Sequence, residues 1–215
     1  CVPEDQKSLI RETPWGTMTY LEYKWKIEFD AEQYKDLCDY TKNLGMDFMV
    51  SCWDRDSVKL IEDNVDIDYH KVASALVTDK DFLNDLVKTG KPIILSTGMS
   101  TQEQVDDAVN ILSPNLKYIL ACTSTYPSNI DELNLRHILT LKDKYPQFSI
   151  GFSNHYSGLD ASLGAVALGA ECIEFHITDD RASYGTDQAA SIENSDALVE
   201  GINIMGRMLG DGIKK

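Results

Sequence analysis

The amino-acid sequence predicts an α/β fold in which parallel β-strands alternate with α-helices. Apolar, β-rich runs recur along the chain and begin roughly every 22 to 32 residues, which is the repeat of a βα unit. Segments with helical periodicity fill the gaps between these runs. The runs are apolar almost throughout, as expected of strands that are covered on both faces of a sheet.

Six strands are expected, at residues 46–53, 69–76, 91–98, 116–124, 148–155 and 172–178. Helices are expected at residues 31–45, 81–90, 101–112, 134–145, 161–170 and 194–210. Ser100 and Asn194 stand where helix N-caps are needed, and Gly45, Gly90 and Gly169 mark helix ends before the next strand. Residues 1–30 are polar and aromatic without a buried-strand run, so we expect a long loop there.

Both a doubly wound sheet and a TIM (β/α)8 barrel show this alternation. Nearly every strand run ends in small polar residues, among them Ser96, Ser124 and Ser153. A ring of polar strand ends around one mouth is typical of the barrel, whereas a doubly wound sheet gathers them near one switch point. Neither G-x-G-x-x-G nor G-x-x-x-x-G-K-[ST] occurs. We therefore predict one partial TIM-barrel domain over residues 1–215, with six visible βα units and a loop-rich N-terminal segment, 1–30.

Composition excludes several classes of protein. The 215 residues carry a formal net charge of −15, which repels phosphate backbones and makes nucleic acid an unexpected partner. No apolar run reaches the roughly 20 residues of a membrane helix, and the first residues lack a signal-peptide pattern. The five cysteines form no C-x-x-C pair, so they suit a reducing compartment. We expect a cytoplasmic protein without a membrane segment.

His155 and His176 end two consecutive strand runs. If these strands are neighbours in a parallel sheet, both imidazoles lie at the same end of it, within reach of one metal ion such as Mn, Fe, Co or Zn. The alternative is that each histidine only forms hydrogen bonds at a polar strand end. The residues alone leave both possibilities open.

Lys71 lies in a strand run, three residues before Ser74. An unpaired lysine is costly to bury, so it either meets an anion beside hydroxyl groups, reaches solvent, or pairs with an acidic neighbour. Ser96, Ser124 and Ser153 recur at successive strand ends and could donate to phosphate or carboxylate oxygens. Asp187, in the loop after the last strand, could hold a polyol or act as a base, and it could equally begin the turn to the final helix.

Several motifs, taken together, indicate a family. GKPIILSTGM, CTSTYP, NLR, GFSNHYSG, AVALGA, CIEFHIT and GTDQAAS occur in this order. They resemble the sialic acid synthase (N-acetylneuraminate synthase) family over nearly the whole chain. PWGTMTYLEYKWKIEF is similar to the segment that follows the second barrel strand in those enzymes. The resemblance implies a (β/α)8 barrel that condenses phosphoenolpyruvate with an N-acetylated amino sugar such as N-acetylmannosamine, giving a nine-carbon 2-keto acid and phosphate.

The resemblance also assigns roles to residues. It implies a divalent metal, Mn²⁺ or Mg²⁺, held by His155 and His176, which are catalytic together with Asp187. It implies phosphoenolpyruvate-binding positions at Lys71, Ser74, Ser96, Ser124 and Ser153. It implies sugar-binding positions at Tyr126 and Asp187.

Three residues depart from the family pattern. Phe175 stands where many members have a Lys or Arg, Gln188 stands where they have a histidine, and Cys52 stands where a threonine is usual. We interpret them as altered sugar preference. The family's first two strands and its C-terminal antifreeze-like domain, which caps a partner subunit's site in a homodimer, have no counterpart, so we do not expect this chain to be active alone. The alternatives are the same chemistry on another acceptor, as in legionaminic or pseudaminic acid synthesis, and a non-catalytic sugar-binding barrel.

Overall fold

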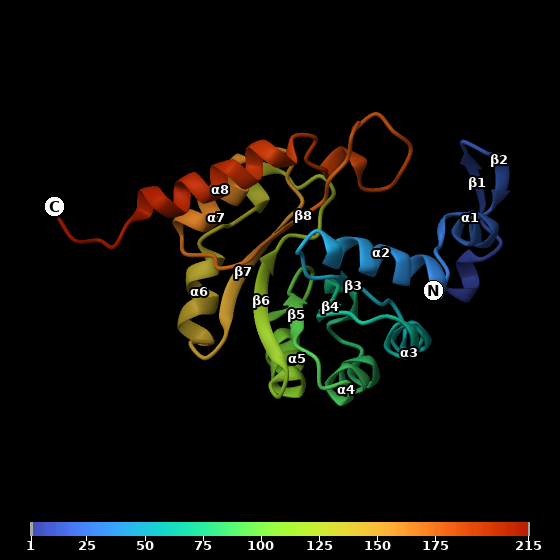
Figure 1. Ribbon diagram of the computed structural model, residues 1–215, viewed down its shortest axis with the longest axis horizontal. Helices are drawn as coiled ribbons and strands as arrows, with labels where there is room; N and C mark the ends of the chain where they lie inside the picture. Colours follow the sequence, from blue (N-terminus) through green and yellow to red (C-terminus); the bar gives the residue numbers. More distant parts are fainter. Residues whose placement is uncertain (1, 215) are drawn as a thin grey trace. The chain divides into compact units, whose positions relative to one another are not determined.

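The computed structural model describes residues 2–214 and has an α/β fold (Figure 1). Six strands are hydrogen-bonded in the order in which they follow along the chain. They are β3 (Met49–Val50), β4 (Tyr69–Val72), β5 (Ile93–Ser96), β6 (Leu116–Cys122), β7 (Ser149–Asn154) and β8 (Ile173–Phe175). A doubly wound sheet reverses its order at a switch point, and these six strands do not. The prediction of six βα units in barrel order is confirmed.

Two compact units make up the chain, Cys1–His70 and Lys71–Lys215. The single domain expected over residues 1–215 stays a prediction. All of the candidate site residues belong to the second unit, so the site can be described within that unit alone.

The first unit begins with structure where a loop was expected. Its elements are η1 (Glu4–Gln6), β1 (Ile10–Thr13), β2 (Gly16–Thr19), α1 (Tyr20–Ile27), α2 (Ala31–Asn43), β3 and α3 (Arg55–Asn64). The loop prediction for residues 1–30 was therefore wrong: β1 and β2 form an antiparallel hairpin. Thr13 closes its turn by donating to the Gly16 carbonyl, and Gly16 has a φ of +100°. The strands are largely exposed, which explains why no apolar run marks them.

The second unit contains the rest of β4, β5 to β8 and the helices that follow them. These are η2 (Ser74–Leu76), α4 (Lys80–Lys88), α5 (Gln102–Leu112), η3 (Ile130–Glu132), α6 (His137–Lys144), α7 (Asp160–Ala167), η4 (Gln188–Ala190) and α8 (Ser195–Leu209). In Figure 1, α4 lies beside α5 and α7 beside α8. Helix α4 completely buries Phe82, Leu83 and Leu86, each worth about 1.5–3 kcal/mol. This apolar packing fixes the strands whose ends carry the site.

Helix boundaries follow the expected signals, with one shift. Gly45, Gly90 and Gly169 have φ values of +77°, +76° and +86°, as helix-ending glycines do. Asn194 caps α8 by accepting from the Ala197 amide at 3.0 Å. The cap of α5 is Thr101 and not Ser100, because the Thr101 hydroxyl accepts from the Gln104 amide. Within residues 2–214 no helix combines the length and apolar character needed to cross a bilayer.

Candidate functional site

The register of the sheet places the histidines on one face. Ser153 in β7 lies opposite Glu174 in β8. Because side chains alternate along a strand, His155 and His176, two positions further on, continue on the same face. Their ring centroids are 5.3 Å apart. The structure thus brings together the two histidines singled out from the sequence.

A polar group lies where the strands end, and we call it the strand-end floor: Lys71, Ser96, Ser153 and Glu174. The Lys71 ammonium is 3.2 Å from one Glu174 oxygen, and the Ser96 hydroxyl donates to the other at 3.0 Å. Lys71 is only 5% exposed, so it does not reach solvent. Of the roles that the sequence left open for Lys71, pairing with an acidic neighbour is present in the structure.

Glu174 is the residue that sequence reasoning missed. Burial raises the pKa of its carboxyl, but the Lys71 charge and the hydrogen bonds from Ser153, Lys71 and Ser96 outweigh burial, so the pKa is lowered. The carboxylate is therefore ionised at neutral pH and orders the donors around it. An acidic residue inside an apolar strand run, two positions before a histidine, is the signal that could have revealed it.

A second pair of hydroxyls lies next to a glycine. The Ser74 and Ser124 oxygens are 3.1 Å apart. Gly98, from the STGM motif, approaches both: a Cβ there would lie 2.1 Å from the Ser74 Cβ and 2.4 Å from the Ser124 oxygen. Its φ of +41° also suits glycine. Gly98 is thus the residue that permits these two hydroxyls to converge.

His155 is held in one tautomer. Its Nδ1 lies 2.7 Å from the Thr123 carbonyl, which can only accept, so Nδ1 carries the proton and Nε2 keeps its lone pair. Burial is the main cause that lowers the pKa of His155. The residue is 4% exposed. A neutral imidazole with a free Nε2 is the form that ligates a metal.

Tyr126, His176 and Asp187 form a more exposed group, which we call the loop rim. The Tyr126 ring lies 4.0 Å from the His155 ring and 5.8 Å, edge-on, from the His176 ring. Asp187 Oδ2 is 3.6 Å from His176 Nδ1. Burial, followed by the nearby Cys122, Asp187 and Glu174, raises the pKa of Tyr126 to about 12. Its hydroxyl therefore stays protonated and able to donate.

The donor set fits a divalent metal in part. Two imidazoles on one ion, with bonds of about 2.1 Å, have ring centroids roughly 4.5–5.5 Å apart, and the measured separation is 5.3 Å. Each Nδ1 faces an oxygen, Thr123 O or Asp187 Oδ2, the arrangement that orients ligating histidines. Among residues 2–214 no group of three His, Cys, Asp or Glu side chains is arranged to hold an ion. The pair thus offers two ligands, and others must complete the shell.

The three departures from the family pattern lie in different surroundings. Phe175 alternates to the face opposite Glu174 and His176. The Gln188 side chain packs against Gly185, where a Cβ would lie 2.0 Å from its oxygen. Cys52, in the first unit, is 3% exposed, and burial is the main cause that raises its pKa to about 12. The altered sugar preference suggested for them stays a prediction.

Comparisons with known proteins identify a matching family and several relatives. The model of the NeuB family matches residues 2–214. N-acetylneuraminate-9-phosphate synthase of Mus musculus is 36% identical over 94% of this chain and 56% of its own length. N,N'-diacetyllegionaminic acid synthase of Campylobacter jejuni is 35% identical over 88% of this chain and 58% of its own length. The chain thus spans little more than half of these relatives.

A solved structure gives the same answer for the fold. The N-acetylneuraminic acid synthetase of Leptospira borgpetersenii, crystallised with citrate, superposes with a TM-score of 0.81 at 30% identity. The match covers 87% of this chain and 67% of that one. The likeness therefore extends over β-strands and helices of both compact units.

Proposed function

Because this chain belongs to the NeuB family, we propose that it is the barrel of a sialic-acid-type synthase. The reaction condenses phosphoenolpyruvate with an N-acetylated amino sugar, N-acetylmannosamine or a close analogue, to give a nine-carbon 2-keto sugar acid and phosphate. One observation carries the proposal. Ser153 and Glu174 of the floor lie opposite each other in β7 and β8, two residues before His155 and His176, and Glu174 contacts Lys71.

Phosphoenolpyruvate suits the floor and the hydroxyl pair. It presents a phosphate and a carboxylate, and the face offers Lys71 together with the hydroxyls of Ser74, Ser96, Ser124 and Ser153. The chain has a net charge of −15, so an anionic substrate must be held by locally placed cations. The buried Lys71 is such a cation. Glu174 holds the Lys71 ammonium in place at 3.2 Å before the anion arrives.

The metal, Mn²⁺ or Mg²⁺, would bind Nε2 of His155 and of His176. When bound, it supplies a Lewis acid that polarises the aldehyde of the open-chain sugar. His155 contributes a neutral ligand because burial lowers its pKa and Thr123 holds its Nδ1 proton. Asp187 orients His176 by facing its Nδ1, the ring nitrogen that would not bind the metal.

The loop rim suits the sugar. The Tyr126 ring lies 4.0 Å from the His155 ring, and its hydroxyl is the proposed donor to the sugar. Asp187 is the proposed acceptor from sugar hydroxyls. With the aldehyde held there, C3 of phosphoenolpyruvate forms the new C–C bond. The former aldehyde oxygen takes up a proton and becomes a hydroxyl. Water adds to C2 and loses one proton. The C2–O bond to phosphate then breaks, the phosphate departs with the electron pair, and the new C2 hydroxyl loses its proton as the keto group forms. Lys71 and the serine hydroxyls stabilise the negative charge on the leaving group.

Two alternatives remain distinct from this proposal. The similarity to a legionaminic acid synthase favours a different acceptor sugar with the same chemistry. A non-catalytic sugar-binding barrel would need neither a buried lysine at an anion site nor two convergent imidazoles. For the whole protein we propose a cytoplasmic homodimer that binds no nucleic acid.

The test is phosphate release by the native full-length protein, loaded with Mn²⁺ and given phosphoenolpyruvate with a panel of N-acetylated amino sugars. We expect release that depends on one sugar, with a 2-keto acid of matching mass. Release with a different sugar would select the legionaminic- or pseudaminic-type alternative. No release with any sugar would contradict the synthase and favour the binding barrel.

A further inference from the structure

The loop that carries Asp187 leaves the sheet after β8 and returns to its starting point. Ile177 and Ile192 form a parallel bridge, in which the Ile192 amide donates to the His176 carbonyl at 2.8 Å. The Thr178 amide donates to the Ile192 carbonyl at 3.1 Å. This bridge fixes both ends of the loop beside His176. A further contact supports the residues between these ends, among them Asp187 of the rim.

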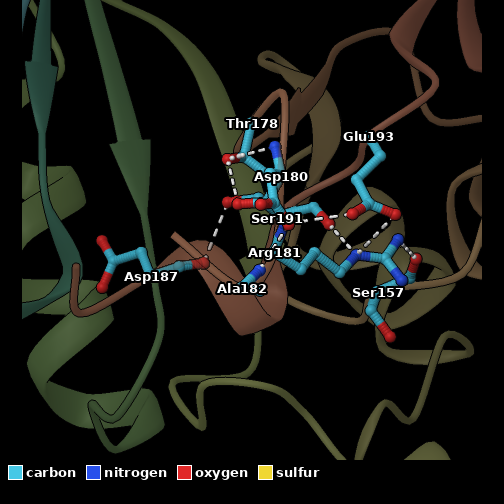
Figure 2. Close-up of polar contacts among 8 residues, drawn as sticks. All are labelled: Ser157, Thr178, Asp180, Arg181, Ala182, Asp187, Ser191 and Glu193. Atoms are coloured by element: carbon cyan, nitrogen blue, oxygen red, sulfur yellow. Dashed lines mark hydrogen bonds and ion pairs between the residues drawn. The ribbon is translucent and has the colours of Figure 1, made fainter. Parts of the chain in front are cut away.

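Arg181 provides that support by joining two loops (Figure 2). Its Nε donates to the Ser191 carbonyl at 2.8 Å, and its terminal nitrogen donates to the Ser157 carbonyl at 2.7 Å. Ser157 lies two residues beyond His155, in the loop after β7. Glu193 accepts from the Arg181 amide at 3.0 Å and lies 3.8 Å from Nε. One guanidinium therefore connects the loop of His155 with the loop of Asp187.

The connection reaches Asp187 through a single residue. The Ser191 hydroxyl donates to the Asp187 carbonyl at 2.9 Å, and the Ala190 amide donates to the same carbonyl at 3.0 Å. Figure 2 shows the Asp187 carboxylate pointing away from the Arg181 cluster, with only its main-chain carbonyl facing Ser191. The cluster thus holds the backbone of Asp187 and leaves the carboxylate free to face His176.

We propose that Arg181 is a positioning residue for the acceptor sugar, acting through the backbone of the Asp187 loop. This inference rests on the proposed function and adds a residue to it. Arg181 touches neither the strand-end floor nor the hydroxyl pair in any contact of the described residues, so phosphoenolpyruvate binding should not depend on it. A lysine cannot replace it fully, because two carbonyls in different directions require the planar fork of guanidinium.

The experiment compares Arg181→Gln and Arg181→Lys with the wild type, and uses Arg207→Gln, on the exposed face of α8, as a matched control. In the native full-length protein we expect the KM for the sugar to rise about tenfold or more in Arg181→Gln and by less in Arg181→Lys. The KM for phosphoenolpyruvate should stay within about twofold in both variants. The control should leave both constants unchanged.

A second readout does not need catalysis. Hydrogen exchange should accelerate together in residues 156–159 and 182–191 of Arg181→Gln, while β6 and α5 keep their protection. An unchanged sugar KM, or an equal rise of both KM values, would overturn the proposal. If the wild type releases no phosphate, the proposed function fails by itself. In that case hydrogen exchange alone tests the positioning role of Arg181. Unchanged protection of residues 156–159 and 182–191 in Arg181→Gln would overturn it.

Discussion

The strand-end floor and the loop rim lie on the same face, yet they are built in different ways. In the floor, Lys71, Ser96 and Ser153 are 5%, 2% and 2% exposed, whereas the Glu174 side chain is 35% exposed. Sheet register sets the places of Ser96, Ser153 and Glu174. In the rim, Tyr126 is 44% exposed, and loop hydrogen bonds set the place of Asp187. The floor is thus fixed mainly by the packed parallel sheet, whereas the rim depends on a few loop contacts that can change. We infer that the anionic substrate meets a rigid site and the sugar an adjustable one.

The largest effect is expected from Lys71→Met, which breaks the floor. The substitution removes the buried cation and leaves the Glu174 carboxylate without its partner. We expect kcat/KM for phosphoenolpyruvate to fall by about 10²–10³-fold, as when a preorganised donor is lost. Lys142→Met is the matched control, because Lys142 donates to the Gly169 carbonyl away from the site. A loss smaller than about fivefold would contradict the role of Lys71.

The next effect concerns the histidine pair, in which the buried His155 faces His176 of the rim. His155→Ala should weaken Mn²⁺ binding by about 100-fold, because one of two converging imidazoles is lost. His137→Ala, on α6, serves as the control and should bind Mn²⁺ like the wild type. Titration by calorimetry or electron paramagnetic resonance measures both. Equal affinity in His155→Ala and wild type would favour the non-catalytic binding barrel.

Two glycines, Gly98 beside the hydroxyl pair and Gly206 on α8, allow the effect of an added methyl group on stability to be compared at the site and at the surface. Gly98→Ala forces a Cβ against Ser74 and Ser124 at positive φ, so we expect a loss of about 1–3 kcal/mol in the free energy of unfolding. Gly206→Ala on α8 meets nothing within 4 Å and should gain about 0.5–1 kcal/mol from helix propensity. Denaturant unfolding measures both. A neutral Gly98→Ala would show that the two hydroxyls are not fixed.

The smallest effect is expected at Phe175. Its side chain lies on the face of β8 opposite Glu174, so it should not touch either substrate. Phe175→Lys should therefore leave both KM values within about twofold of the wild type. Steady-state kinetics with each substrate varied in turn would detect a larger change. A change in sugar preference would support the interpretation of Phe175 as a specificity residue.

The fold was predictable because its signals are local and repeated. Apolar runs of β-branched residues, glycines at helix ends and the cap at Asn194 each follow from a few neighbouring residues. The N-terminal hairpin was not predicted, because its strands are largely exposed and carry no apolar pattern. Helix α3 was also missed, although Val58 and Ile61 lie three residues apart and are both buried.

Within the candidate site, the sequence predicted only the residues that lie at the ends of recognisable strand runs. His155 and His176 could be paired because sheet order places neighbouring strand ends together. Glu174 could not be assigned a partner, because Lys71 lies about a hundred residues earlier and on another strand. Arg181 acts on main-chain carbonyls, and no side-chain motif identifies such contacts.

The division between floor and rim is tested most directly by one crossed measurement. The two KM values are determined for the native full-length protein, for Lys71→Met and for Asp187→Asn. We predict that Lys71→Met raises the KM for phosphoenolpyruvate with little change for the sugar. Asp187→Asn should raise the KM for the sugar with little change for phosphoenolpyruvate. If each substitution raises both constants equally, the two substrates do not bind to separate parts of the site, and the account is wrong.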